Sequence, residues 1–133
     1  MSSYRIWLVA ASVAAASVGV AHAQDRPAPN MSFFITSAGP GNGGNLGGLK
    51  GGDGRCTQVA ASVGAGNKTW RAYLSAAGEN GGPDIHARDR IGSGPWFNYK
   101  GVQVAASVAD LHSDNNKLSK ENSLREKGTV INR

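Results

Sequence analysis

Apolar residues recur with a helical period in one stretch near the middle of the chain. Cys56, Val59, Ala60 and Val63 follow the i, i+3, i+4, i+7 spacing that places them on one face of a helix. Asp53 precedes them, and its carboxylate can accept the unpaired amide protons of a first turn. Glycines follow at 64 and 66. The pattern therefore predicts an amphipathic helix with Asp53 as its N-cap and a glycine stop.

The pattern changes to strict alternation directly after that stop. Trp70, Ala72 and Leu74 alternate with the more polar Arg71 and Tyr73 over residues 69–75, which is the period of a strand with one buried face. The aromatic ring of Tyr73 lies on the opposite face of this strand and indicates that other residues partly cover that face as well. We expect this segment to be a central strand, against which the helix packs.

Further strands are predicted on both sides of this unit. Residues 32–37 are aromatic and β-branched and predict a first core strand, and the alternation from 102 to about 108 predicts another. Residues 85–91 are read as a short strand or a turn of helix, and 129–131 regain strand character. Nine glycines between 39 and 54 predict a wandering loop. Residues 76–84 form a turn-rich link.

The beginning of the chain has the parts of a cleavable export signal. Arg5 precedes an apolar run from Ile6 to Val20, and small residues at 21 and 23 then form a cleavage pattern. A membrane span is the competing reading, but this run is shorter than the roughly 20 residues that a bilayer requires. We predict a signal peptide over 1–23, a flexible lead over 24–31, a domain over 32–133, no stable membrane span after cleavage, and a secreted or periplasmic location.

Charge and cysteine content narrow the function classes. Removing Arg5 leaves 13 basic and 9 acidic residues, which are spread along the chain without the basic stripe of a nucleic-acid binder. Cys56 is the one cysteine, in a protein expected where disulfides form. It is buried as a small apolar residue, pairs between chains, or has a partner outside this sequence.

No motif in the chain predicts catalysis or a cofactor. Gly39 to Gly44 fits G-x-G-x-x-G in letters, but no helix opens after it and no βαβ unit follows. His86 and His112 lack further ligands at a recognised spacing. Residues 110–116 are rich in oxygen ligands, so calcium is an alternative to an Asx-rich turn, although the EF-hand glycine and glutamate are absent. We predict a non-enzyme without a metal site.

A second aromatic cluster supplies the candidates for ligand binding. Trp96, Asn98 and Tyr99 follow a glycine- and proline-containing turn, and exposed rings with a neighbouring amide suit the face and hydroxyls of a sugar. Large aromatic residues in a small domain also serve as core, which is the competing reading, above all for Trp70.

Residues 56–75, with their cysteine-bearing helix and the segment Thr-Trp-Arg-Ala-Tyr-Leu-Ser, resemble the corresponding part of endostatin, a collagen-derived domain of C-type lectin-like fold. The mature chain as a whole is more similar to small exported bacterial proteins labelled as lectins. The segments that carry this resemblance are 33–37, 45–49, 87–92, 94–96 and 109–112.

The resemblance implies an α+β, C-type lectin-like (endostatin-like) fold, with one principal helix on a small, mostly antiparallel sheet and long glycine-rich loops. Such domains continue beyond the point matched by Arg133 and contain a further cysteine, so this chain looks C-terminally truncated, with the partner of Cys56 outside it. The sugar-binding motifs of true C-type lectins have no match here. We expect a non-catalytic module that binds a glycan or another extracytoplasmic ligand, or alternatively a structural or protein-interaction domain of the cell envelope.

Overall fold

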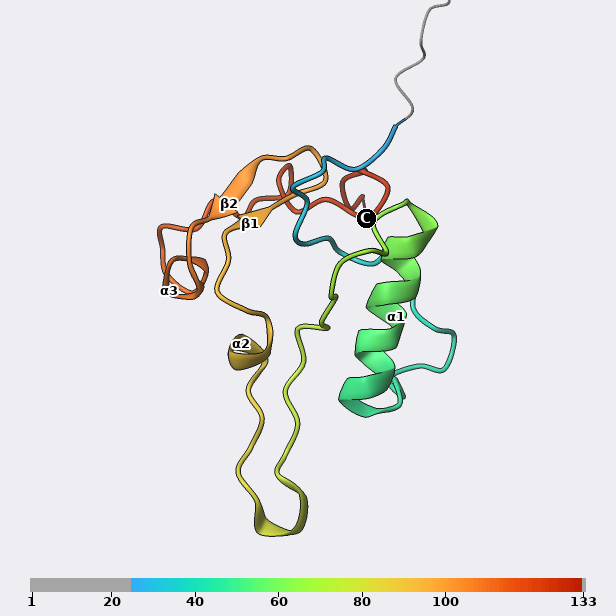
Figure 1. Cartoon of the computed structure of the whole chain (residues 1–133), viewed down its shortest axis with the longest axis vertical. Helices are drawn as coiled ribbons and strands as arrows, with labels where there is room; N and C mark the ends of the chain where they lie inside the picture. The colour runs from blue at the N-terminus through green and yellow to red at the C-terminus, as the bar shows by residue number, and fades with distance from the viewer. Residues whose placement is uncertain (1–24, 133) are drawn as a thin grey trace, which may run out of the picture.

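The computed structural model describes residues 25–132, and the predicted signal peptide lies outside this range. The described residues form a small α+β fold with three α-helices and a two-stranded antiparallel sheet (Figure 1). In chain order the elements are α1 (Gly48–Ser62), the 3-10 turn η1 (Glu79–Gly81), α2 (Ala87–Arg90), β1 (Trp96–Phe97), β2 (Gln103–Ala105) and α3 (Val108–Leu111).

Helix α1 begins earlier than predicted. Its N-cap is Gly47, with a left-handed φ of 75°, and Asp53 lies inside the helix, so the prediction of Asp53 as the cap is wrong. Glycines make this early start possible because the helix lies close to the chain beside it. A Cβ on Gly52 would lie 2.8 Å from Leu74 Cδ1, so a side chain at this position would force Leu74 to move. The predicted stop is confirmed, since α1 ends at Ser62 and Gly64 follows with a φ of 82°.

Residues 69–75 keep the predicted alternation but do not form the predicted central strand. Trp70 and Ala72 are buried, whereas Arg71 and Tyr73 are exposed. The Leu74 amide donates to Ala72 O at 2.8 Å, which closes a γ-turn around Tyr73. This bend turns the Tyr73 ring outward and interrupts the extended backbone that a ladder requires.

The predicted first strand is also reduced. Within residues 32–37 only Ile35 makes a bridge, in parallel with Arg125, and its amide donates to Leu124 O at 2.9 Å. The segment is held by Glu126 instead, whose Oε2 accepts from the Ser37 amide at 2.9 Å and whose Oε1 accepts from the Ser37 hydroxyl. One buried side chain thus takes the place of several ladder bonds.

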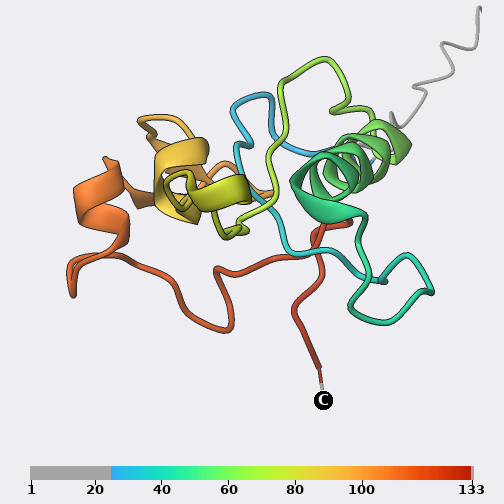
Figure 2. The ribbon, with the colours of Figure 1, turned by 90° about the horizontal axis from the view of Figure 1, so that it is seen from below.

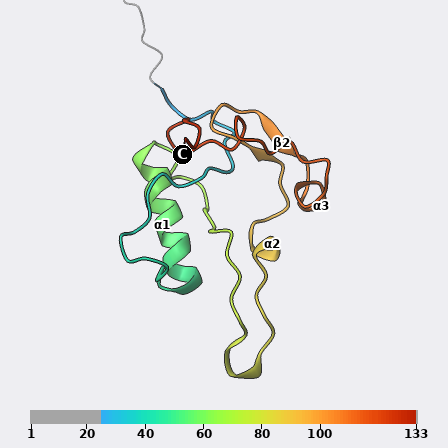
Figure 3. The same ribbon diagram turned by 180° about the vertical axis from the view of Figure 1, so that it is seen from behind.

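A hairpin arm, residues 76–85, projects from the body of the molecule (Figures 1 and 3). Ala76 and Ile85 exchange both backbone hydrogen bonds at 2.9 Å. At the tip Asn80 and Gly81 both have positive φ, of 51° and 79°, and Gly82 N donates to Glu79 O. These are the features of a type I′ turn. The sequence analysis predicted only a turn-rich link here, although the dipeptide Asn-Gly is the strongest short-range signal for a hairpin.

Strands β1 and β2 pair antiparallel, with Trp96 opposite Ala105 and an irregularity before the Phe97 to Gln103 pair. The strand predicted to reach residue 108 ends at Ala105, because Ser107 caps α3 by accepting from the Asp110 amide at 3.1 Å. Asp110 Oδ2 in turn accepts from the Ala106 amide at 2.7 Å. Residues 129–131 form no strand.

The described residues bury two apolar clusters. The first contains Met31, Ala60, Ala65, Trp70, Tyr99 and Leu124, and the second contains Trp96, Val104 and Ala105. Figure 2 shows α1 on one side of the molecule and α3 on the other, with the central chain segments between them. The sheet and α3 carry the second cluster, and α1 packs on the first.

Residues 25–31, the part of the predicted lead that the structure describes, are packed against the rest of the molecule. Met31 is fully buried, Ala28 N donates to Tyr99 O at 2.8 Å, and Tyr99 OH donates to Asp25 O at 2.8 Å. The reason is that a methionine at the end of the lead fills the first cluster beside Leu124.

We expect Met31→Ala to lower the free energy of unfolding by about 2 to 4 kcal/mol, because it leaves a cavity in the first cluster. Urea denaturation of the mature chain measures this, with Pro29→Ala at an exposed position as the control. Equal stability of the two variants would show that the lead does not contribute to the core.

Candidate functional site

An apolar cleft of about 410 Å³ separates the two clusters, and we call it the aromatic cleft. Its apolar lining comes from Phe33, Phe34, Trp70, Ala72, Ile91, Trp96, Val104, Leu111 and Leu118. Polar side chains join the lining at Ser32, Thr69, Arg71, Tyr73 and His112, and the Cys56 thiol completes it. Its volume falls within the range of roughly 300 to 1,000 Å³ typical of small-molecule sites.

Trp70 forms the wall of the cleft on the α1 side. Its Nε1 donates to Ala65 O at 2.8 Å, which fixes the indole directly after the end of α1. The ring of Phe34 packs against it with centroids 4.9 Å apart and planes inclined by 59°. This tilted geometry is one that aromatic pairs prefer. The wall is therefore held by a hydrogen bond and by ring packing at once.

Trp96 and Val104 line the cleft from the second apolar cluster, and only 6% of Trp96 is exposed. The backbone of Gly94, with a φ of 86°, passes close to the indole ring of Trp96, and a Cβ on Gly94 would lie 2.3 Å from Trp96 Cζ3. The glycine before the proline is thus required for the tryptophan to lie flat against the chain. Ligand access to Trp96 is restricted to the part of the ring that lines the cleft.

The other two predicted ligand-binding residues do not line the aromatic cleft. Asn98 is 1% exposed, and its Oδ1 accepts from the amides of Lys100 and Val102 at 3.0 Å each. Tyr99 is buried in the first cluster. Burial raises the pKa of the Tyr99 hydroxyl, and the charge and hydrogen bond of Asp25 raise it further. The structure therefore does not bring Trp96, Asn98 and Tyr99 together as an exposed platform. Asn98 instead stabilises the turn that follows it, and Tyr99 is part of the first apolar cluster.

The rings of Tyr73 and His112, which no sequence pattern connects, lie together at the mouth of the cleft. Tyr73 OH and His112 Nε2 are 2.7 Å apart, and their rings stack with centroids separated by 5.9 Å. His112 Nδ1 lies 2.7 Å from Val108 O, which can only accept, so Nδ1 is the donor in that contact, and in the neutral ring Nε2 then accepts from the Tyr73 hydroxyl. No local sequence signal links residues 39 positions apart.

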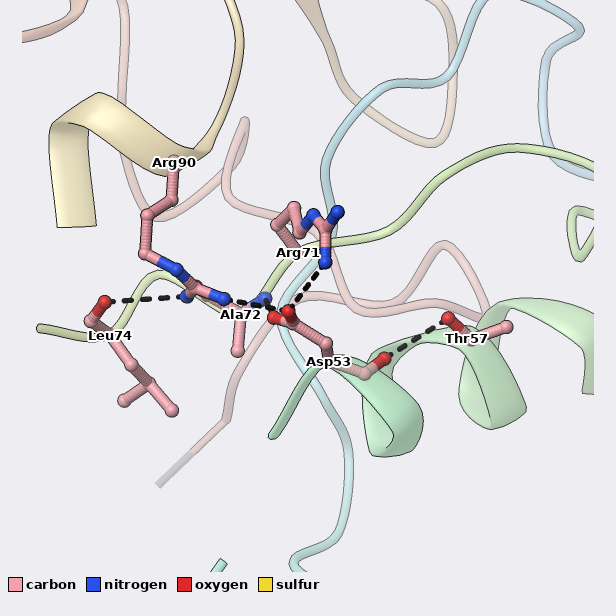
Figure 4. A network of polar contacts seen from close by, with 6 residues as sticks. All are labelled: Asp53, Thr57, Arg71, Ala72, Leu74 and Arg90. Carbon is pink, nitrogen blue, oxygen red and sulfur yellow. Dashed lines mark hydrogen bonds and ion pairs between the residues drawn. The ribbon is translucent and has the colours of Figure 1, made fainter. Parts of the chain in front are cut away.

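Arg71, which lines the cleft, also belongs to a network of charged groups with Asp53 and Arg90 (Figure 4). Asp53 Oδ2 accepts from Arg71 Nη1 at 2.9 Å and from Arg90 Nη2 at 2.6 Å, and Oδ1 accepts from the Ala72 amide at 2.8 Å. Burial raises the pKa of Asp53, but the Ala72 amide and the two guanidinium groups outweigh it, so the net pKa is lowered. One carboxylate therefore serves two cations and joins α1, the alternating segment and α2.

Cys56 is half-buried and lines the aromatic cleft. Burial raises the pKa of its thiol, the Asp53 charge raises it further, and Arg55 acts in the opposite direction. A thiol held protonated is a poor nucleophile and a small apolar lining group. The pairing of Cys56 with a cysteine outside the chain stays a prediction.

A larger hollow of about 960 Å³ lies beside residues 25–29 and 62–68. Its lining mixes apolar residues such as Val63 and Tyr99 with polar and charged side chains, and Lys68 Nζ donates to Pro29 O at 2.7 Å and to Met31 O at 2.6 Å. The aromatic cleft is smaller, but it is the more apolar of the two and is lined by both Trp70 and Trp96, so it is the stronger candidate site.

Within residues 25–132 no group of three or more His, Cys, Asp or Glu side chains is arranged to hold a metal ion. His86 is exposed at the start of α2, far in sequence from His112. Over the same described range, no helix combines the length and apolar character needed to cross a membrane. Comparisons with protein-family models, with curated proteins and with solved structures find no match to this chain.

Proposed function

We propose that the protein is an exported, non-catalytic binding module that holds the apolar part of a ligand in the aromatic cleft. The observation that carries this proposal is the pair of tryptophans, one from each apolar cluster, that face the same cavity. The leader expected over 1–23 supports a secreted or periplasmic place of action. The Cys56 thiol, with its raised pKa, offers no activated nucleophile in the cleft.

The composition of the cleft supports binding through burial of apolar surface. Aromatic and aliphatic side chains form most of the lining, and Arg71, Tyr73 and His112 are among its polar side chains. Small-molecule sites commonly combine such an apolar body with a few polar groups that set orientation. Each apolar Å² that a ligand removes from water contributes about 25 cal/mol to affinity before the costs of association.

A glycan is the second candidate ligand, in line with the expected C-type lectin-like fold. The observation that favours it is the Tyr73 ring, which is 58% exposed and stacked on His112 at the cleft mouth. An exposed ring beside hydrogen-bonding groups is a surface on which a sugar can stack. In this proposal the binding residues are Tyr73 and His112 rather than Asn98 and Tyr99.

Intrinsic fluorescence tests the first proposal directly. After removal of the leader, which contains Trp7, the two remaining tryptophans are Trp70 and Trp96, and both line the cleft. Titration of the mature protein with octan-1-ol should give a saturable change in their emission, and titration with methyl glycosides should give none. A response to glycosides alone would favour the lectin-like alternative, and a flat response to octan-1-ol from folded protein would overturn the apolar-ligand proposal.

We expect Leu118→Gln to weaken octan-1-ol binding about threefold to tenfold, because Leu118 lines the cleft and its apolar contact is lost. Val102→Gln is the matched control, since Val102 is equally exposed, at 44%, but lies outside the cleft lining. The same fluorescence titration measures both variants. Equal weakening by the two substitutions would place the bound alcohol elsewhere.

A further inference from the structure

We propose that the ligand of the aromatic cleft is an amphiphile with an anionic head group, and that Arg71 receives this head. The inference rests on the proposed function, since it names the ligand class of the same cleft. Its starting point is the charge of the network beside the cleft, where the guanidinium groups of Arg71 and Arg90 share the single carboxylate of Asp53. The three groups together carry one unbalanced positive charge.

We assign the unbalanced charge to Arg71 because both terminal nitrogens of Arg90 already donate hydrogen bonds. The side chain of Arg90 is 12% exposed, and it donates to Asp53, to Ala72 O at 2.9 Å and to Leu74 O at 3.4 Å. The side chain of Arg71 is 50% exposed and, within residues 25–132, makes its hydrogen bond to Asp53 through Nη1 alone. Figure 4 shows its other guanidinium nitrogens turned away from Asp53.

The position of Arg71 joins this charge to the apolar cavity. Arg71 lines the cleft next to Trp70, and no aspartate or glutamate belongs to the lining. A ligand whose apolar body lies beside Trp70 and Trp96 would therefore meet a cation at the edge of the cleft, and the Asp53 carboxylate next to that cation lies outside the lining and is shared by two guanidinium groups. A planar guanidinium with free donors matches a carboxylate in shape as well as in charge.

The probe pair octanoate and octan-1-ol isolates the head group, because the two share the same chain length. We expect octanoate to bind the mature protein about fivefold to tenfold more tightly than octan-1-ol by tryptophan fluorescence at pH 7 and low salt. The preference should shrink as salt is added, since Arg71 is exposed enough for screening. The arginine variants Arg71→Gln, Arg71→Lys and, as a control outside the cleft on α2, Arg88→Gln separate the role of charge from that of packing.

Arg71→Gln should remove the preference for octanoate over octan-1-ol, whereas Arg71→Lys should keep most of this preference and Arg88→Gln, outside the cleft, should keep all of it. Thermal unfolding of each variant verifies that it is folded. Equal affinity of the wild type for octanoate and octan-1-ol would overturn the anionic head group while leaving the apolar cleft in place. A preference for octanoate that survives Arg71→Gln would likewise overturn the role of Arg71 and leave the apolar cleft in place. Absence of binding by both probes would overturn the proposed function itself.

Discussion

Replacing Asp53 with alanine is expected to lower the free energy of unfolding by about 3 kcal/mol. The carboxylate accepts three hydrogen bonds, from Arg71, Arg90 and the Ala72 amide. Its removal leaves Arg90, whose side chain is 12% exposed, as a buried cation without its counter-ion. Breaking a buried ion pair from one side is costly because the remaining charge stays out of water.

Chemical denaturation of Asp53→Ala and of Arg71→Gln separates the buried half of this network from its exposed half. Arg71 is half exposed, so its pair with Asp53 is screened and its loss should cost no more than about 1 kcal/mol. Similar losses from the two substitutions would contradict the assignment of Arg90 as the critical partner.

The pH dependence of stability gives an independent check on Asp53. Its pKa in the folded protein is lowered from the ordinary value of 3.8, so the contribution of the ionised carboxylate is complete well above that value. It is lost as the pH falls through the lower pKa of the folded state. The difference in stability between wild type and Asp53→Asn should therefore shrink on acidification. A difference that stays constant down to the acid limit would show that charge is not the source of the stabilisation.

The substitution Trp70→Ala should destabilise the protein by about 3 to 5 kcal/mol, because the indole fills the space between α1 and Phe34. Trp70→Phe retains most of this packing but removes the Nε1 donor, which leaves Ala65 O without its bond at the end of α1. We expect this milder substitution to cost about 1 to 3 kcal/mol.

Urea denaturation of the two Trp70 variants, followed by far-ultraviolet circular dichroism, measures both losses. Circular dichroism is the suitable probe because the substitutions remove half of the tryptophan signal of the mature chain. If both variants were as stable as wild type, Trp70 would belong to an exposed surface, contrary to its burial of all but 7% of its area.

The alternation of residues 69–75 and the glycine after α1 were predictable from sequence because each depends on local chemistry. Trp70 and Ala72 are buried, as their spacing indicated, and Gly64 follows the helix with a positive φ. The coarse α+β class follows from these local features. The prediction that residues 69–75 pair as a central strand was wrong, because an alternating segment need not join a sheet. The γ-turn at Tyr73 and the Asp53 bond to the Ala72 amide replace ladder partners, and side-chain contacts between distant residues do not appear in a local pattern.

The candidate site was less predictable than the fold. Trp96 was identified and lines the cleft, but Asn98 and Tyr99 look the same in sequence whether they face a sugar or complete a turn and a core. The pairing of Tyr73 with His112 depends on how α3 is placed relative to the alternating segment. An acidic residue directly before an apolar helical pattern resembles an N-cap, which is why the sequence predicts Asp53 as the cap. In the structure the glycine-rich segment before Asp53 is already helical, so Asp53 lies more than one turn inside α1.

The hairpin arm supports itself, because Asp84 Oδ1 accepts from the Gly78 amide and Gly78 has no room for a side chain beside Gly82 O. Its tip carries no part of the cleft lining. Guest peptides or labelling tags grafted between Asn80 and Gly81 would therefore leave the cavity unchanged, which makes this loop the natural attachment point for immobilising the protein in a ligand screen.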